Sequence, residues 1–363
     1  MYCVYWNDDY ATLGGKAMKK SFLKRLAAAA LAGVFSVALL AGCGGEKSGS
    51  SSGGSGKPVA QTQQAPKSGE KMKINFPTAS ASGALYAVGA AICNNWNQTV
   101  PTVNAASQAS AGGIENLGMV SDGEAQVSIA ISSNVYQCMN GTEGFTDHAY
   151  KDIKAVAGLY LNPNQVVATD KSGINTLTDV KGKHFAVASA GSSVYNECMT
   201  HFTAAGLKFP DDINAEFINF TGASDMLQNG TIDGAWIMSG APASAVSQAL
   251  TSKCHLIDID DKVISELQSK YPWYVKYTIP AGTYPNQEKD IKTSAIKMVM
   301  FCRGDLPEEV VYQMTKSFWE HIDELGASQK NLKGLKPADA VKDIAGIPLH
   351  KGAEKYYKEI GVL

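Results

Sequence analysis

The chain has 363 residues, of which 45% are hydrophobic and 18% are charged, and its formal net charge at pH 7 is -2. This length is enough for two domains of ordinary size, and the composition is that of a globular protein. The near-neutral charge excludes the strongly basic surface that nucleic-acid binding requires.

The first part of the chain has the pattern of a bacterial lipoprotein signal. A positively charged segment, residues 18–25, precedes an uncharged Ala/Leu-rich run, residues 26–40, and Leu-Ala-Gly-Cys then ends at Cys43. A transmembrane helix is the alternative interpretation, but the run is short for a span and ends in small residues. We therefore predict lipidation of Cys43 and a location in the periplasm or on the outer face of the cell membrane.

The predicted domain organisation follows from this signal. Residues 1–42 form an upstream extension with the signal peptide, and Met18 is the more plausible start. Residues 43–70 are rich in Gly and Ser with almost no apolar side chain, which is typical of a flexible tether. The folded body then begins near residue 71.

The cysteines downstream of Cys43 are odd in number, so at least one is a free thiol or pairs with another chain. None lies in a C-x-x-C spacing, which excludes a thioredoxin motif and a zinc knuckle. Buried thiols and at most two disulfides both remain open. These residues are Cys93, Cys138, Cys198, Cys254 and Cys302.

Strand and helix patterns alternate along the folded body. The first predicted elements are a strand at 73–76, a helix at 84–96, an extended segment at 101–107, a helix at 110–120, a strand at 126–131, a helix at 135–141 and a strand at 152–160. The pattern restarts with strands at 166–169 and 184–188, a helix at 192–206, strands at 215–220 and 231–238 around a helix at 223–230, and an amphipathic, then extended, segment at 262–277. A strand at 294–302 and helices at 307–325 and 350–361 complete the chain.

This alternation predicts an α/β protein of βαβ units with a mostly parallel sheet. Residues 120–131 and 227–238 share one pattern, a short helix, an Asp-Gly or Asn-Gly turn and an apolar strand, which fits two similar lobes. We predict lobe 1 at 71–165, lobe 2 at 166–275, and a return to lobe 1 with the C-terminal helices at 276–363. Such a path has two hinge crossings, near Val166 and Tyr277.

Small hydroxyl and glycine residues gather at the predicted strand-to-helix junctions. Ligands of open α/β sheets bind there, beyond the carboxyl ends of the strands. Helix capping is the alternative for each loop taken alone. We expect a ligand cleft between the lobes, with tyrosines supplying an apolar body and one polar group. The candidate ligand-binding residues are Ser80, Ser82, Gly83, Tyr86, Ser110, Asn134, Tyr160, Ser192, Ser193, Ser239, Gly240 and Pro242.

The segment after the signal contains one arginine, Arg303, just before a helix start. We interpret it as a solvated turn residue. Because no guanidinium is then available, a carboxylate ligand would be held by backbone N–H groups, hydroxyls and helix dipoles.

An enzyme is the rival class. Ser192 with His184 or His201 is the one candidate nucleophile and base, but there is no G-x-S-x-G elbow and no identifiable acid partner. The histidines lack metal-ligand spacing, and neither a P-loop nor a G-x-G-x-x-G motif is present. We expect no catalysis, no cofactor and no metal.

Seven segments in order resemble one family. They are INFPTASASGALYAVGAAI, AGGIENLGMVSDGEAQVSIAISSN, VKGKHFAVASAGSS, NGTIDGAWIMSGAP, YTIPAGTYPNQEKDI, RGDLPEEVVYQMTK and PLHKGAEKYYKEIG. Over residues 72–363 the chain resembles the TAXI family of TRAP-transporter solute receptors. The resemblance implies a two-lobed, type II-like periplasmic binding protein that closes on an amino acid, such as glutamate or glutamine, or on an organic acid. It also implies delivery to the integral membrane subunits of a sodium-coupled TRAP transporter.

Three alternatives remain at this point. One is an ABC-type receptor for a sulfonate or a thiamine-precursor-like compound, which would have the same fold. The second is a surface serine hydrolase, and the third is a structural lipoprotein with an empty cleft.

Overall fold

The computed structural model describes residues 10–13, 16–19, 71–79, 84–110, 112–146, 149–190 and 192–363. The chain divides into two compact units, Met1–Val59 and Ala60–Leu363. In the first unit β1 (Tyr10–Leu13) and β2 (Lys16–Lys19) form an antiparallel pair, in a stretch where no strand is predicted. The predicted apolar signal run, Cys43 and the tether lie outside the described residues.

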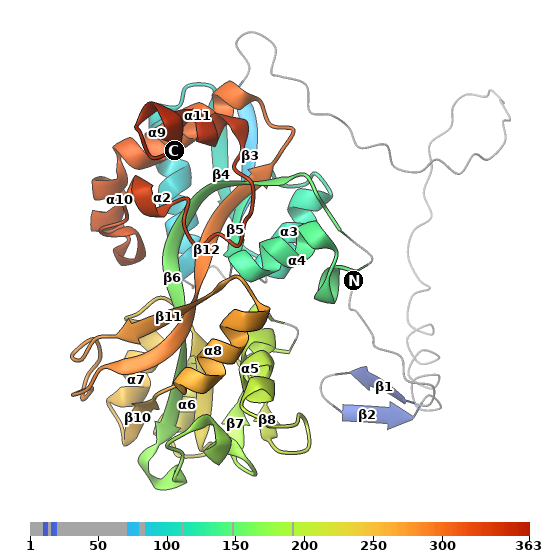
Figure 1. Cartoon of the computed structure of the whole chain (residues 1–363), viewed down its shortest axis with the longest axis vertical. Helices are drawn as coiled ribbons and strands as arrows, with labels where there is room; N and C mark the ends of the chain where they lie inside the picture. The colour runs from blue at the N-terminus through green and yellow to red at the C-terminus, as the bar shows by residue number, and fades with distance from the viewer. Residues whose placement is uncertain are drawn as a thin grey trace, which may run out of the picture. The chain divides into compact units, whose positions relative to one another are not determined.

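The second unit consists of two lobes (Figure 1). Lobe 1 contains β3 (Met72–Pro77), α2 (Ala84–Thr99), β4 (Val103–Gln108), α3 (Gly113–Ser121), β5 (Val127–Ile131), α4 (Ser132–Asn140), α9 (Glu308–Glu320), α10 (Ile322–Ser328) and α11 (Lys351–Glu359). Lobe 2 contains β7 (His184–Ala186), α5 (Ser193–Ala204), β8 (Asn214–Glu216), α6 (Phe220–Gln228), β9 (Gly234–Met238), α7 (Ser244–Leu250), β10 (Cys254–Ile257), α8 (Asp261–Lys270) and β11 (Tyr274–Ile279). Single 3-10 turns lie at Glu143–Phe145, Asp170–Ser172, Leu177–Val180, Lys330–Leu332 and Pro337–Asp339.

Two long strands belong to both lobes. β6 (Ile153–Thr169) and β12 (Ile291–Arg303) pair antiparallel and run from one lobe into the other (Figure 1). β6 joins into one strand the two segments that the sequence analysis separates, and the return path follows β12 rather than the segment near Tyr277. The residues opposite each other near the crossing include Asn162 with Ile296 and Pro163 with Ala295.

The prediction of a mostly parallel sheet is wrong. The main sheet has the order β11-β12-β6-β9-β7-β8, with β10 also on β6 and β5 also on β12. The parallel pairs that the structure describes are β7 with β8, β7 with β9, and β3 with β4 in a separate two-stranded sheet. Each lobe shares the same two oppositely directed crossing strands, so most of its pairs are antiparallel.

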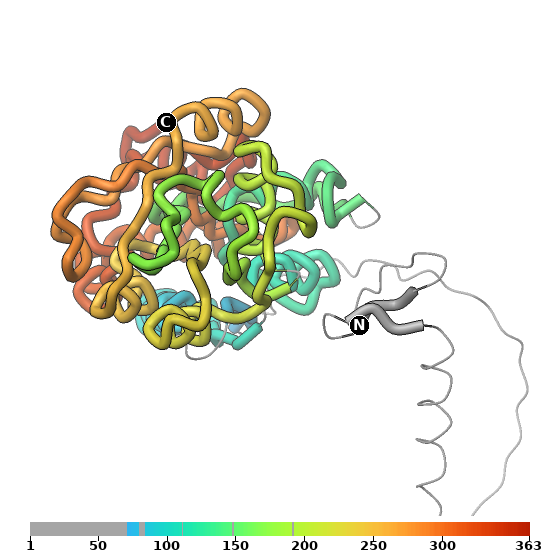
Figure 2. The backbone as a smooth tube through the Cα atoms, turned by 90° about the horizontal axis from the view of Figure 1, so that it is seen from below, coloured from blue at the N-terminus to red at the C-terminus, as the bar shows by residue number. Residues whose placement is uncertain are grey.

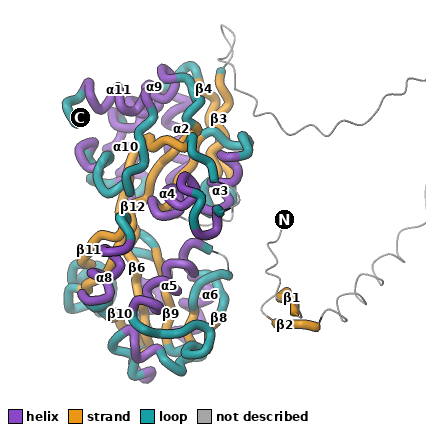
Figure 3. The backbone as a smooth tube through the Cα atoms, turned by 45° about the vertical axis from the view of Figure 1, so that its right-hand side comes forward, coloured by secondary structure: helices purple, strands orange, loops and turns teal. Residues whose placement is uncertain are grey.

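Helices cover the strands in both lobes (Figure 3), and lobe 2 lies in front when the molecule is seen from below (Figure 2). Helix α2 shows why these segments pack. Val88, Ile92 and Trp96 recur every four residues and are buried, so they form one apolar face. Trp96 stacks on Phe76 with ring centroids 5.7 Å apart, and its Nε1 donates to the carbonyl of Met314 in α9 at 2.9 Å. This pairing ties the start of lobe 1 to its C-terminal helices.

The predicted single helix at 307–325 is two helices. α9 ends at Glu320 and α10 begins at Ile322, because His321 has φ -114 and ψ 19, outside helical values. Within the described residues no helix is both long enough and apolar enough to cross a membrane.

Candidate functional site

The two lobes meet where helices follow strands. In lobe 1, α4 begins directly after β5, at Ser132. In lobe 2, Ser192 caps α5, and its Oγ accepts a hydrogen bond from the backbone N–H of Tyr195 at 3.1 Å. The first residues of these two helices face each other, so two helix N-termini converge from opposite lobes.

Side chains join α4 to lobe 2 directly. Ser193 Oγ donates to Asn134 Oδ1 at 2.5 Å, and Ser133 Oγ donates to Glu197 Oε1 at 3.4 Å. The ring centroids of Tyr136 in α4 and Trp273 before β11 lie 5.4 Å apart. We call this contact of α4 with α5 and the start of β11 the seam. The lobes are therefore closed on each other at the seam.

Glu197 is an acid that sequence reasoning missed. Its side chain is buried at the seam, where Oε2 accepts from the hydroxyl of Tyr274 at 2.7 Å. Burial raises the pKa of Glu197 to about 7, although the bonds from Tyr274 and Ser133 act in the opposite direction. The helical spacing contains a usable signal, because Glu197 and His201 share the buried face of α5 with Cys198 and Phe202.

A second contact between the lobes lies beside β6. A β-carbon on Gly240 would lie only 3.0 Å from Oδ1 of Asn331, so lobe 2 approaches lobe 1 closely here. Asn331 also lies beside Tyr160, where its side chain acts to lower the pKa of that hydroxyl. Burial raises the pKa of Tyr160 to about 12, so its hydroxyl stays protonated and able to donate.

Hydrogen bonds with Gln165 and Tyr284 hold the loop that follows β9. Gln165 Nε2 donates to the carbonyl of Ser239 at 2.8 Å, and the Tyr284 hydroxyl donates to Gln165 Oε1. The same hydroxyl accepts from the N–H of Ala243 at 2.9 Å. Tyr284 is thus a buried residue that supports this loop.

The predicted ligand-binding residues lie in different places in the structure. It brings Asn134 and Ser193 together at the seam. Ser192 caps α5, as the capping alternative has it. Ser110 precedes the N-cap of α3, which is Gly112, and its Oγ donates to Asn116 Oδ1 at 2.6 Å. Tyr86 is half-buried in the first turn of α2, and Pro242 is exposed. Three predicted residues lie outside the described residues: Ser80, Ser82 and Gly83.

Two buried hydroxyls stand at strand ends in lobe 1. Among the described residues, Ser107 Oγ in β4 and Ser132 Oγ at the start of α4 are buried without a hydrogen-bond partner. Buried polar groups are normally satisfied, so these hydroxyls mark places where a ligand or water would be accommodated. Both lie at the carboxyl ends of strands, where ligands of α/β sheets bind.

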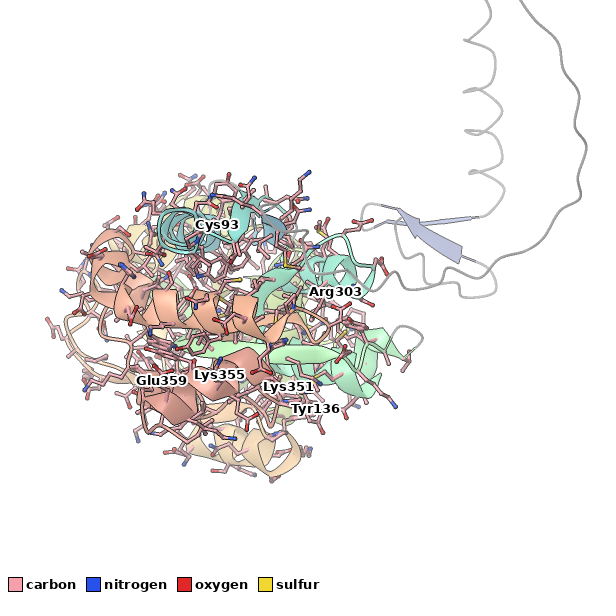
Figure 4. All side chains as sticks on the ribbon, turned by 90° about the horizontal axis from the view of Figure 1, so that it is seen from above. Cys93, Tyr136, Arg303, Lys351, Lys355 and Glu359 are labelled. Carbon is pink, nitrogen blue, oxygen red and sulfur yellow. The ribbon has the colours of Figure 1, made fainter. Side chains whose placement is uncertain are left out.

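The interpretation of Arg303 as a solvated turn residue is wrong. Its side chain is buried at the end of β12, next to α3 (Figure 4). The guanidinium makes two hydrogen bonds to Asp305, of 2.9 and 2.7 Å, and one of 3.2 Å to the carbonyl of Val120. The Arg303 guanidinium therefore forms its hydrogen bonds inside lobe 1. Its partner Asp305 has a lowered pKa, first because of the hydrogen bond from Arg303.

The catalytic candidates have other partners. Ser192 Oγ donates to the carbonyl of Ser189 at 2.7 Å. His184 lies by Thr231 and Glu216, and His201 lies 2.7 Å from Ser294 Oγ. Across the described part of the chain no group of His, Cys, Asp or Glu is arranged to hold a metal ion. The five cysteines after Cys43 are all buried and free, and burial raises the pKa of each.

Comparison with solved structures shows the fold. The chain is similar to PhnD1 from Prochlorococcus marinus in complex with methylphosphonate, with a TM-score of 0.50 and 10% identity over 80% of this chain and 99% of that one. It is also similar to the alkanesulfonate-binding protein SsuA from Xanthomonas axonopodis pv. citri bound to MOPS, with a TM-score of 0.46 and 15% identity over 80% and 84% of the two chains. A putative L-cystine ABC transporter from Listeria monocytogenes gives a TM-score of 0.45 and 14% identity over 75% and 99%.

A sequence profile of one family covers most of the folded body. The profile of the NMT1-like family matches residues 76–361, which includes both lobes and both crossing strands. The predicted α/β fold with two lobes is confirmed, and the two-lobed periplasmic binding proteins share it.

Proposed function

We propose that this chain, which belongs to the NMT1-like family, is an extracytoplasmic solute-binding protein that encloses a small organic solute between its lobes and delivers it to a membrane transporter. The observation that carries the proposal is the seam. Polar side chains from the starts of α4 and α5 meet across two lobes that are joined by β6 and β12. Two lobes on two crossing strands can open and close as bodies, and a solute that contacts both favours the closed form.

The polar groups that the structure describes at the site are neutral hydroxyls and amides. Asn134, Ser193, Tyr160 and Asn331 offer hydroxyl and amide groups, and no lysine or arginine in the described part of the chain donates to them. A carboxylate would be bound by N–H groups, hydroxyls and helix N-termini. An amino acid such as glutamate or glutamine, or a small organic acid, remains our proposal for the ligand.

The transporter class has two candidates. The sequence resemblance favours a sodium-coupled TRAP transporter. The comparisons instead include a putative sulfonate ABC transporter and a putative L-cystine ABC transporter, which support the alternative. Uptake by membrane vesicles separates the two. A sodium ionophore abolishes TRAP transport, whereas ATP depletion abolishes ABC transport. We also propose the lipid anchor at Cys43, which mass spectrometry of the mature N-terminus tests.

A thermal-shift screen tests the binding function. Amino acids, dicarboxylates and alkanesulfonates are each added at 1 mM and above. A solute at 100 times its Kd stabilises the folded chain by about 2.7 kcal/mol, which is a clear shift in Tm. No shift across all three classes would contradict the proposal.

Variants of the seam test where the solute binds. Ser193→Ala and Tyr160→Phe each remove one hydroxyl, and we expect about a fivefold weaker Kd, since one hydrogen bond contributes about 1 kcal/mol. Ser269→Ala is the matched control, because its exposed hydroxyl bonds only to the carbonyl of Glu266 in α8. If all three variants bind the solute with the same Kd, the solute does not bind at the seam.

A further inference from the structure

Glu197 is a carboxylic acid that contacts both sides of the seam. Its carboxyl lies on α5 of lobe 2. It accepts a hydrogen bond from the hydroxyl of Ser133 in lobe 1 at 3.4 Å and another from the hydroxyl of Tyr274 in β11 at 2.7 Å. The side chain has 5% relative exposure, and Ser133 of α4 in the other lobe lies against it. Moving α4 away would therefore return the carboxyl toward water.

Among the described residues no cation compensates the charge of this acid. Burial raises the pKa of Glu197, and the hydrogen bonds from Tyr274 and Ser133 lower it. No lysine, arginine or second carboxylate contributes to the shift. The titratable groups facing it are Tyr274 from β11, with Tyr271 beyond it, and His201 on its own helix. β9 presents Trp236 to His201, and α4 presents Ser133, neither of which titrates in the range considered.

The two protonation states fit the seam differently. A neutral carboxyl can donate to Ser133 and accept from Tyr274, which satisfies both of its oxygens. An ionised carboxyl in the same place carries a charge that is buried without a counter-ion. The closed seam is therefore matched to the acid in its neutral form.

We propose that Glu197 is a proton-linked latch: closure of α4 onto α5 takes up one proton at this carboxyl, so the closed form gains population as the pH falls. The proposal rests on the proposed function, because only a two-lobed receptor opens and closes in this way. It adds that a mildly acidic exterior strengthens capture of the solute and that alkaline conditions weaken it.

The size of the effect follows from linkage. Glu197 has a pKa of about 7 with the seam closed, and we take the ordinary value of 4.5 for the open form. The ratio of closed to open forms then falls about tenfold between pH 6 and pH 8. Below pH 4.5 the effect is complete, and it is lost as the pH rises through 7.

Hydrogen–deuterium exchange of the full chain without any added solute measures this ratio. Amides of α4 and of the first turn of α5 report on the seam, and amides of α9 report on global unfolding. After correction for intrinsic exchange, we expect protection of the seam amides to fall about tenfold from pH 6 to pH 8 relative to α9. Glu197→Gln keeps the neutral shape, so its seam protection should be high and independent of pH.

Glu266→Gln is the matched control, since the Glu266 side chain on α8 keeps 38% of its accessible surface and pairs with Lys270 at 2.8 Å. It should behave as the unmodified chain does. Seam protection that does not change with pH, or that changes equally in Glu197→Gln, would overturn the latch. A carboxyl that is buried equally in both forms would change the pH dependence of global unfolding alone, and this too would overturn it. Since no solute is present, failure here leaves the binding proposal standing, and failure of the solute screen leaves this result standing.

Discussion

Asn164 joins the two crossing strands to lobe 2, and replacing it with alanine should destabilise the chain strongly. The side chain is buried in β6. Its Nδ2 donates to Ser294 Oγ of β12 at 3.0 Å, and its Oδ1 accepts from Trp236 Nε1 of β9 at 3.1 Å. Ser294 continues to His201 Nε2 at 2.7 Å. One asparagine thus satisfies groups on two other strands, close to the point where the chain passes between the lobes.

The protonation of this network is determined by geometry. His201 Nδ1 lies 2.7 Å from the carbonyl of Glu197, so Nδ1 carries the proton and Nε2 accepts from Ser294. Burial lowers the pKa of His201 to about 4, which keeps the ring neutral above that pH. Ser294 therefore donates to His201 and accepts from Asn164. Each donor and acceptor in the row has one defined partner.

The expected loss is the sum of two terms. Asn164→Ala leaves the buried N–H of Trp236 without an acceptor, which costs about 1–3 kcal/mol, and removes the hydrogen bond to Ser294, which contributes about 1 kcal/mol. We expect the free energy of unfolding to fall by about 2–4 kcal/mol. Urea unfolding followed by circular dichroism measures it, with an unchanged m-value as the sign that the folded state stays compact.

A double-mutant cycle tests the reasoning itself. Trp236→Phe removes the donor that Asn164→Ala strands, so the double variant should be about 1–2 kcal/mol more stable than the sum of the single losses predicts. Asn175→Ala is the matched control, because its exposed amide bonds only to the carbonyl of Gly173, and it should change stability by less than about 0.5 kcal/mol. A loss below that limit for Asn164→Ala, or strict additivity with Trp236→Phe, would refute the account of the hinge.

Two further predictions concern close packing and pH. Gly158→Ala should lower the free energy of unfolding in urea by about 1–3 kcal/mol, because the new β-carbon would lie 2.7 Å from the carbonyl oxygen of Ala340. Gly118→Ala in α3 is the control. Its new β-carbon would meet nothing within 4 Å, so the variant should be neutral or stabilising by up to about 1 kcal/mol. If both alanines behave alike, the packing at Gly158 is not as described. The raised pKa of Glu197 contributes stability that is present below pH 4.5 and is lost as the pH rises through about 7, so the stability of the unmodified chain relative to Glu197→Gln should fall by about 2 kcal/mol from pH 5 to pH 7. His201 has the opposite sign, with stability lost as the pH falls from 6.5 through about 4, and it cancels in this comparison; parallel curves for the two chains would show that Glu197 is not buried as described.

Local patterns in the sequence were enough for most elements. The helix with Gly206 as its stop is α5, which ends at Ala204, and Gly206 has φ 85, where glycine is favoured. The alternating apolar segments are strands, and α11 is the predicted C-terminal helix. These features depend on backbone preferences and on side-chain periodicity over a few residues, so they are visible without knowledge of the rest of the chain. The two-lobed α/β class followed from their order.

Tertiary structure decided the contacts that make the site. Ser193 and Asn134 are 59 residues apart in sequence, Tyr274 and Glu197 are 77 apart, and Tyr284 and Gln165 are 119 apart. No local pattern encodes such pairs, because each forms only after β6 and β12 have brought distant segments together. The antiparallel character of the sheet has the same origin. The sequence by itself therefore determined most of the strands and helices, though not β10, and where hydroxyl-rich loops follow them. Which of those loops face each other, and that a buried acid lies between them, was decided by long-range strand pairing and burial.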